Sequence, residues 1–195
     1  ADAHSAGAAA PQILVARNLE PIYDLPTALR AFAQVLRVHP QARLVVAGTG
    51  PSEASLKALA AELGMADRVE FTGRLDREAM AERLRASTVA LNPSTADNMP
   101  NSVLEALASG VPVVSTRVGG VPFIVEDGRT ALLVPPRDPQ AMADALLRLL
   151  ADPALARRLA QDGLASVQAY TWPRVAPLWA EVYRVAAPTR GRAHA

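Results

Sequence analysis

Two acidic residues eight positions apart stand where the chain passes from a loop into a short helix. Asp97 lies in a loop after an apolar run, and Glu105 lies inside the helical pattern that begins near Pro100. The N-terminus of such a helix offers unpaired N–H groups and about half a unit of positive charge, which suit an anion such as a diphosphate. Ionised carboxylates beside it accept hydrogen bonds from sugar hydroxyls. Spacing alone leaves open that Asp97 is a turn residue and Glu105 a capping or surface residue.

Arg17 is a further candidate, because it follows directly after an apolar run near the N-terminus. At the end of a buried strand, its guanidinium can hold a phosphate through two parallel hydrogen bonds. The spacing equally allows an exposed Arg17 that pairs with Glu20 or Asp24, so this alternative stays open as well.

Two pairs of glycines follow later apolar runs. Gly48 and Gly50 stand in the loop GTGP, and Gly119 and Gly120 stand in RVGGVP. Glycine lets a backbone approach a ligand closely, and a helix that starts after the first pair would offer N–H groups to an anion. The first pair is also typical of a tight turn, and the second indicates a flexible or close-approach loop.

The sequence argues against several other kinds of site. The loop at 17–24 has no glycine, so the G-x-G-x-x-G of dinucleotide-binding folds is missing there, and no G-x-x-x-x-G-K-[ST] occurs. The chain has no cysteine, and its histidines, His4, His39 and His194, lie in the tails or before a proline. We therefore expect no metal site and no histidine dyad. A net charge of +1 provides no field that would attract nucleic acid.

Short apolar runs alternate with longer patterns of helical period. Most of the runs show no polar alternation, which is typical of strands buried on both faces. They lie at residues 13–16, 43–47, 69–72, 88–91, 112–115 and 131–134. The alternation predicts an α/β fold with a doubly wound, parallel, Rossmann-like sheet. In such folds ligands bind at the carboxyl ends of the strands, where the candidate residues stand.

Single residues mark the expected helix ends. Pro100 suits the first position of a helix, and Asp138 followed by a proline is a start signal. Gly64 and Gly110 stand where helices should end. A tail helix at 172–186 carries an aromatic and aliphatic stripe, which either packs on the domain's own sheet or is exposed as an interface.

In their order along the chain, these motifs resemble the family 4 (group 1) glycosyltransferases. They are Arg17 after the first strand, AGTGP at 47–51, FTG at 71–73, LNPS at 91–94, Asp97-x7-Glu105 followed by ALASG, PVVST at 112–116, the glycines at 119–120 and DGRTALLVPPRD at 127–138. The likeness covers residues 13–150 and beyond. It implies the C-terminal, donor-binding half of the GT-B architecture, in which two Rossmann-like domains face each other across a cleft.

The resemblance implies roles for the candidate residues. Glu105 matches the second acid of the family's E-x7-E motif, which typically binds the donor ribose, and Asp97 matches the first acid, which contacts the transferred sugar. Arg17 matches an arginine that contacts the diphosphate, and these three are the expected catalytic residues. Arg74 and Leu75 lie where the nucleobase is usually gripped. The remaining expected donor-binding residues are Asn98, Met99 and Asn101, through backbone N–H groups, and Gly48, Gly50, Gly119 and Gly120.

The chain departs from the family pattern at several positions. Asp97 is one methylene shorter than the usual Glu, and Tyr23 with Asp24 replaces the usual Lys-Gly pair, which removes a positive charge and introduces a negative one. Phe123 replaces an acid, and Ala131 replaces a glycine. These changes fit either a divergent subfamily or an enzyme with weak or lost donor turnover.

The resemblance also sets the expected organisation. We expect a flexible linker or cut end at 1–11, the sugar-nucleotide-binding domain at 12–170, a crossover helix at 171–187 and a flexible tail at 188–195. The N-terminal acceptor domain, onto which that helix would cross, is missing from this sequence. A cytoplasmic location follows from the family, with a peripheral place at the inner membrane face as a variant.

Three functional hypotheses follow. The first is retaining transfer of a sugar from a UDP- or GDP-sugar to an unknown glycan, lipid or small-molecule acceptor, without an essential metal or other cofactor. The second is a nucleotide-binding module that transfers no sugar by itself. The third is an interaction domain without a ligand.

Overall fold

The computed structural model describes residues 10–186, in which six parallel strands form one sheet in the order β3-β2-β1-β4-β5-β6. The strands are β1 (Gln12–Ala16), β2 (Arg43–Ala47), β3 (Val69–Gly73), β4 (Val89–Asn92), β5 (Val113–Thr116) and β6 (Leu132–Val134). The doubly wound parallel sheet is thus confirmed, and the strand bounds differ from those expected by at most one residue. Most of the expected linker and the whole expected tail lie outside the described residues.

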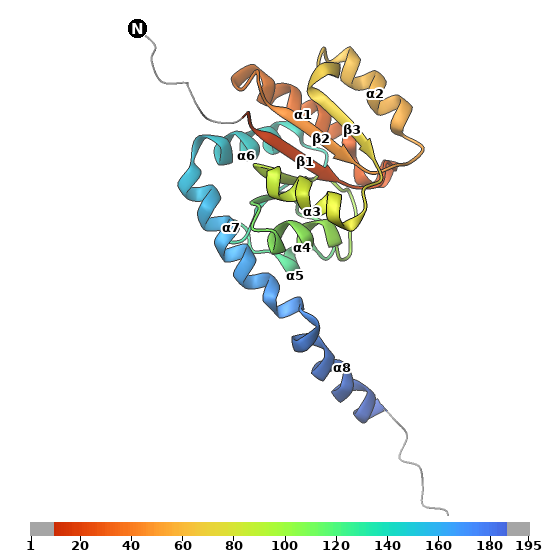
Figure 1. The fold of residues 1–195 in the computed structure, drawn as a ribbon, viewed down its shortest axis with the longest axis vertical. Coiled ribbons are helices and arrows are strands. Elements are labelled where there is room, and N and C mark those ends of the chain that lie inside the picture. The colour runs from red at the N-terminus through yellow and green to blue at the C-terminus, as the bar shows by residue number, and fades with distance from the viewer. Residues whose placement is uncertain (1–9, 187–195) are drawn as a thin grey trace, which may run out of the picture.

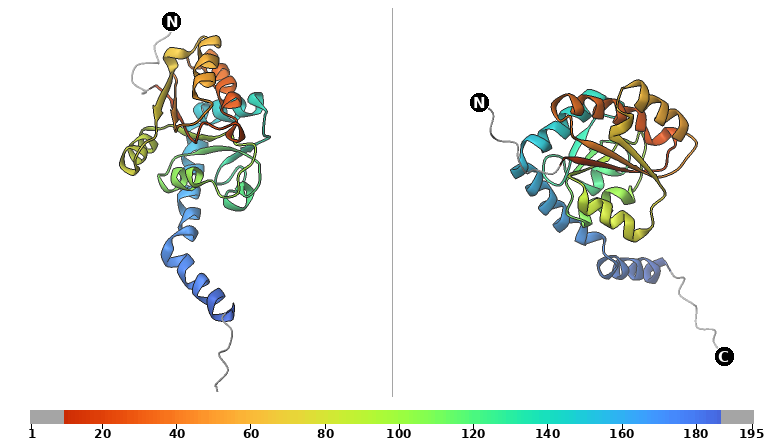
Figure 2. Two further views of the ribbon diagram at one scale, coloured as in Figure 1. Left: turned by 90° about the vertical axis from the view of Figure 1, so that its right-hand side faces the viewer. Right: turned by 45° about the horizontal axis from the view of Figure 1, so that its top comes forward.

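Helices cover both faces of the sheet (Figures 1 and 2). They are α1 (Leu25–Val38), α2 (Glu53–Glu62), α3 (Arg77–Ala86), α4 (Asn101–Ala108), α5 (Val121–Ile124), α6 (Pro139–Ala151), α7 (Pro153–Val167) and α8 (Trp172–Ala186). Successive strand residues point to opposite faces. Ile13 and Val15 of β1 therefore pack in the layer with α1, α2 and α6, whereas Leu14 packs with α3, α4 and α5.

Local signals explain most helix ends. The carboxylate of Asp138 accepts a hydrogen bond from the backbone N–H of Ala141 (2.9 Å) and so caps α6. Gly64 has φ of +70° after α2, a conformation that glycine adopts without steric cost. The expectation for Pro100 is wrong by one position, because Pro100 is extended and precedes the helix, which begins at Asn101. The helix α5 was not predicted, since its four residues are too few to show a helical period in the sequence.

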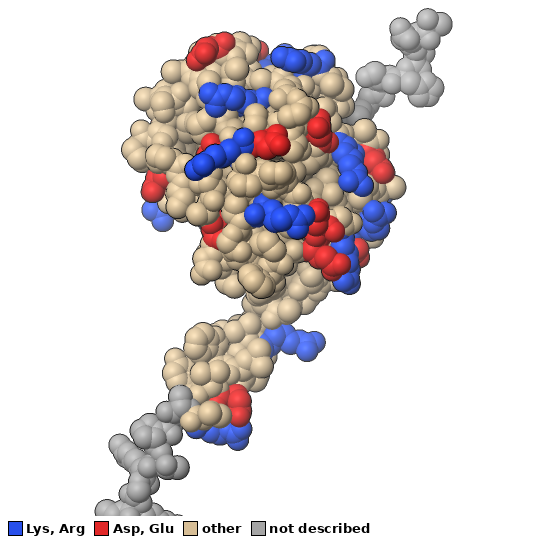
Figure 3. Space-filling model, turned by 180° about the vertical axis from the view of Figure 1, so that it is seen from behind, with Lys and Arg blue, Asp and Glu red and all other residues tan. Residues whose placement is uncertain are grey.

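The helix α8 projects from the domain (Figures 1 and 2). The side chains of Trp172, Trp179, Val182 and Tyr183 are all more than half exposed there. The alternative that the stripe packs on the domain's own sheet is therefore wrong. Figure 3 shows that one side of this helix carries almost no charged groups. Within residues 10–186, every helix is too short or too polar to cross a lipid bilayer.

The contact between α1 and α6 gives a test of the packing. Leu146 of α6 is fully buried in this layer. We expect Leu146→Ala to lower the free energy of unfolding by about 2–5 kcal/mol, because it leaves a cavity in a close-packed core. Urea unfolding measures the loss. Arg148→Ala, at an exposed position of the same helix, should change stability by less than about 0.5 kcal/mol, and equal losses in the two variants would contradict the packing described.

Candidate active site

A cavity of about 250 Å³ opens at the carboxyl edge of the sheet. It lies beside the strands β1 and β4, between which the strand order reverses, and this is the place where doubly wound folds bind ligands. Its lining residues come from the ends of β1 and β2, from the loops after β1, β2 and β3, from α3 and from the start of α4. They are Ala16, Arg17, Asn18, Tyr23, Ala47, Gly48, Arg74, Leu75, Met80, Asn101, Ser102 and Glu105.

Arg17 is held firmly at the wall of this cavity. Its Nη2 pairs with the carboxylate of Asp97, and its Nε donates a hydrogen bond to Oδ1 of Asn92 (3.0 Å). The ring centroid of Tyr23 lies 5.1 Å from the guanidinium carbon, within the range of a cation–π interaction. The expected alternative, an exposed Arg17 paired with Glu20 or Asp24, is therefore wrong.

The Arg17–Asp97 pair is largely withdrawn from solvent. The two side chains are 11% and 9% exposed. Burial lowers the pKa of the Arg17 guanidinium, because it disfavours the charged form, and the nearby Asp97, Tyr23 and Glu105 act in the opposite direction. Asp97 is thus neither a solvated turn residue nor a lining residue of the cavity, but the partner of the arginine in its wall.

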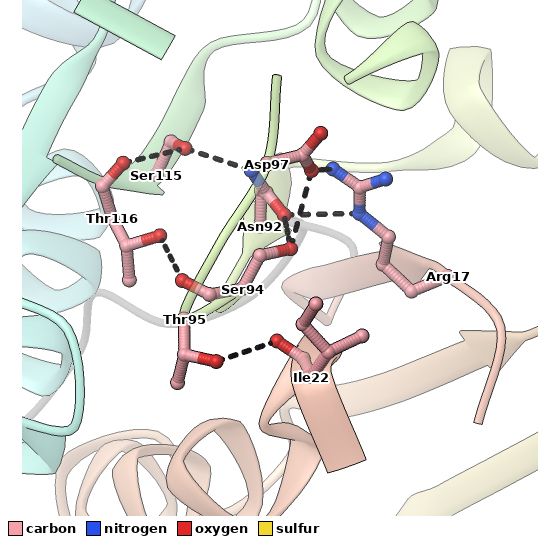
Figure 4. Close-up of polar contacts among 8 residues, drawn as sticks. All are labelled: Arg17, Ile22, Asn92, Ser94, Thr95, Asp97, Ser115 and Thr116. Atoms are coloured by element: carbon pink, nitrogen blue, oxygen red, sulfur yellow. Dashed lines mark hydrogen bonds and ion pairs between the residues drawn. The ribbon is translucent and has the colours of Figure 1, made fainter. Parts of the chain in front are cut away.

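A buried polar network supports this pair (Figure 4). Oδ1 of Asn92 also accepts from the hydroxyl of Ser94 (2.7 Å), and Nδ2 of Asn92 donates to Oγ of Ser115 (3.0 Å). The hydroxyl of Thr116 donates to the backbone carbonyl of Ser94 (2.6 Å). Every buried side-chain polar atom among the described residues has a hydrogen-bond partner. None of these residues was predicted to have a function. The available signal was an asparagine at the end of an otherwise apolar strand.

The loop after β4 is tied to the segment after β1 as well. Both the backbone N–H and the hydroxyl of Thr95 donate to the carbonyl of Ile22 (2.9 Å each), as Figure 4 shows for the hydroxyl. These bonds keep the loop that carries Asp97 beside Arg17, although the two residues are 80 positions apart.

The start of α4 forms the opposite part of the wall. Asn101 and Ser102, in its first turn, line the cavity, and Pro100 provides no side-chain cap for them. The first N–H groups of a helix have no partner within it, so this end of α4 can donate to an anion. Glu105 follows one turn later and is exposed toward the cavity that it lines.

Comparison with known proteins shows the family of the chain. Residues 10–152 match the sequence family described as glycosyl transferases group 1. The chain belongs to this family. A D-inositol 3-phosphate glycosyltransferase of Acidothermus cellulolyticus is 37% identical over 188 residues, which are 91% of this chain and 42% of the relative. The chain therefore spans less than half of the curated relatives that it matches.

Solved structures of glycosyltransferases share the fold. Sucrose-phosphate synthase from Thermosynechococcus elongatus has a TM-score of 0.82 and 35% identity, over 90% of this chain and 45% of that one. The C-terminal domain of a group 1 family protein from Francisella tularensis has a TM-score of 0.75 and 25% identity, over 81% of this chain and 84% of that domain. Alr3699/HepE from Anabaena, solved with UDP-glucose, has a TM-score of 0.83, 21% identity and coverages of 89% and 48%. The expected GT-B half is thus confirmed as the fold.

Several candidate residues of this group 1 chain lie outside the cavity lining. Asn98 and Met99 are exposed in the loop before α4. A Cβ atom on Gly50 would lie 2.5 Å from the carbonyl oxygen of Leu19, so this glycine permits a close approach between two loops of the chain itself. Gly48 lines the cavity, and a Cβ atom on it would lie 1.9 Å from the carbonyl oxygen of Arg17.

Gly119 and Gly120 are packed against the acidic loop of the site. A Cβ atom on Gly119 would lie 2.0 Å from the carbonyl oxygen of Asp97, and one on Gly120 would lie 1.6 Å from that of Asn98. The backbone N–H of Gly120 donates to the carbonyl of Asp97 (2.9 Å). In this group 1 chain the glycine pair therefore supports the backbone that carries Asp97, and it does so by an approach that no side chain would allow.

The departures from the family pattern have local explanations. Tyr23, in place of the usual lysine, presents its ring to the guanidinium of Arg17. The carboxylate of Asp24 accepts from the hydroxyl of Thr27 at the start of α1 (2.7 Å), so its charge is directed to that helix and not to the cavity. Phe123 is 86% exposed, and Ala131 is fully buried.

The glycine pair provides a test of how the acidic loop is held. We expect Gly120→Ala to lower the free energy of unfolding by about 1–3 kcal/mol, because its methyl group must displace the loop at Asn98. The amide resonances of Asp97 and Asn98 should shift in the same variant. Gly128→Ala is the matched control, since Gly128 has φ of +74° but open space around it, and backbone strain alone should cost roughly 1 kcal/mol there. Unshifted resonances in Gly120→Ala would contradict this role.

Proposed function

We propose that this chain binds the donor in a group 1 glycosyltransferase that transfers a sugar from a nucleotide-diphosphate-sugar to an acceptor, with retention at the anomeric carbon. The proposal depends mainly on one observation, the buried guanidinium of Arg17 in a cavity at the switch point of the sheet. A planar guanidinium matches phosphate oxygens in geometry and charge.

The charges around the cavity support a diphosphate in it. Arg17 lines the cavity, and the uncapped start of α4 adds N–H donors. Arg74 and Leu75 line it too and are proposed to contact the nucleobase. Glu105, an acceptor of hydrogen bonds, stands one turn further along α4 and is proposed to bind the ribose hydroxyls. Transfer would then be assisted by stabilising the charge that develops on the leaving diphosphate, without an essential metal ion.

Relatives and structural neighbours support the class of donor. The Anabaena protein was solved with UDP-glucose, and the Acidothermus relative is named a glycosyltransferase that acts on D-inositol 3-phosphate. We propose a UDP- or GDP-sugar as the donor. The acceptor, whether a glycan, a lipid or a small molecule, would bind mainly to a second domain.

That second domain is proposed to cover the projecting helix α8. The coverage of 42% of the Acidothermus relative leaves room for an acceptor domain of similar size, and the exposed face of α8 needs an apolar partner. A nucleotide-binding module without transfer activity is the second candidate for this chain by itself, because its site for the acceptor would then be incomplete. A cytoplasmic location, with or without attachment to the inner membrane face, stays a prediction from the family.

Titration of the chain with UDP, GDP and their sugar conjugates by calorimetry tests donor binding. We expect one nucleoside diphosphate to bind, and Glu105→Ala to weaken its affinity roughly 10- to 100-fold, the cost of a lost hydrogen bond to a charged group. Glu82→Ala removes the same charge from an exposed position on α3 that does not line the cavity, and it should leave the affinity unchanged. No binding by a folded chain would favour the interaction-domain hypothesis, and equal affinities in the two variants would refute the role of Glu105.

Retention and metal independence are tested on the whole protein that contains this chain. We expect the anomeric configuration of the product, followed by proton NMR from the first turnover, to match that of the donor. We expect EDTA to leave the rate unchanged, because the guanidinium and the start of α4 supply the positive charge at the diphosphate. An inverted product, or activity that EDTA removes and a divalent cation restores, would contradict the proposal.

A further inference from the structure

We infer that Asn92 is a positioning residue that orients the guanidinium of Arg17, so that one edge of it stays directed to the cavity for an anion. The inference rests on the proposed donor site and adds to it a residue from the interior of the sheet. Asn92 is the last residue of β4, is 2% exposed and does not line the cavity around Arg17.

The hydrogen bonds of Asn92 leave it one orientation. Its Oδ1 accepts from Nε of Arg17 and from Oγ of Ser94, whereas its Nδ2 donates to Oγ of Ser115. Turning the amide over would bring Nδ2 against the charged Nε–H of Arg17, which can only donate. Since Ser94 and Ser115 are themselves fully buried, water does not offer an alternative partner.

The same bonds divide the guanidinium into two edges. Nε and Nη2 form the edge that faces Asn92 and Asp97. Among residues 10–186, no hydrogen bond engages Nη1, which Figure 4 shows directed away from the network. A planar guanidinium that is fixed along one edge presents its other edge in a fixed direction. The other edge, formed by Nη1 and the second N–H of Nη2, therefore has a fixed direction and can donate to two oxygens of an anion.

Asn92 is distinct in this respect from Asp97. A carboxylate alone attracts the guanidinium but also tolerates rotation about the ion pair, because its oxygens accept from several directions. The neutral, buried amide adds direction without further negative charge beside a site for anions. The guanidinium carbon also lies over the ring of Tyr23, 5.1 Å from the ring centroid, so this side chain limits the positions open to the guanidinium as well.

The proton on Nε of Arg17 reports this orientation directly, without any ligand. In spectra of the nitrogen-15-labelled chain, the Nε–H resonance of Arg17 is identified as the one that disappears in Arg17→Lys. We expect its exchange with solvent to be slow in the wild type and to accelerate about 10- to 100-fold in Asn92→Ala, as loss of a hydrogen bond from a charged donor implies.

Three further variants separate positioning from stability. Asn92→Asp retains an acceptor for Nε and should restore slow exchange. Ser115→Ala leaves Nδ2 of Asn92 unpaired and so destabilises the same network, but it keeps the contact with Arg17 and should leave the exchange slow. Asn92→Ser keeps a buried hydroxyl yet is too short to reach Nε, so it replaces Asn92→Ala if that variant does not fold. Slow exchange in Asn92→Ala, or in Asn92→Ser where it replaces that variant, would overturn the inference.

The effect of this orientation on diphosphate binding is measured by the ratio of the affinities for UDP and UMP. If the chain prefers guanine, GDP and GMP are used instead. Loss of orientation should weaken the diphosphate about tenfold more than the monophosphate in Asn92→Ala, and Ser115→Ala should leave the ratio unchanged. If Asn92→Ala accelerates exchange of the Nε proton but leaves the affinity ratio unchanged, the inference that the oriented guanidinium edge binds an anion is overturned. If the wild type binds no nucleotide, the donor proposal fails, whereas the exchange rates still decide whether Asn92 orients Arg17.

Discussion

The burial of one guanidinium at the point where the strand order reverses is the constraint on which the site depends. A charged group withdrawn from water costs several kcal/mol unless it is paired and hydrogen-bonded, so Arg17 requires partners from elsewhere in the chain. Asp97 provides the opposite charge, and Asn92 provides a directed acceptor. Because both stand at or after the end of β4, the pairing of β1 with β4 brings them to the arginine, and the fold and the site are specified together.

The same constraint extends to residues that touch neither the cavity nor the arginine. The carboxylate of Asp97 reaches Arg17 only while its loop lies in place, and three kinds of contact keep it there. Thr95 bonds to the segment after β1, Thr116 at the end of β5 bonds to Ser94, and Gly120 donates to Asp97 itself. The first contact comes from the segment after β1, and the other two come from β5 and the loop that follows it. Parallel strands end at one edge of the sheet, which allows residues distant in sequence to converge in this way.

The sequence was sufficient for the elements and for the identity of the principal residues, but not for their pairing. Apolar runs located all six strands to within a residue, because buried parallel strands lack polar alternation. Local patterns do not reveal which strands are neighbours. The alternative left open for Arg17 paired it with Glu20 or Asp24 in the same loop, whereas its partner is 80 residues away. The glycines show the same limit. Their close approach was predicted, but that of Gly120 is to the backbone of Asn98, which only the tertiary structure can show.

The proposed donor site lacks the lysine that the family usually has, and this changes what could attract an anion to it. With Asp97 paired to Arg17, the pair has no net charge, and a second cation is replaced by Tyr23. The attraction for an anion then depends less on net charge than on the direction of N–H donors, from the free edge of Arg17 and from the start of α4. Hydrogen bonds lose strength steeply when they are misaligned, so a site that relies on them needs a rigid support. A fully satisfied network of buried side chains behind the arginine is the support that such a site requires.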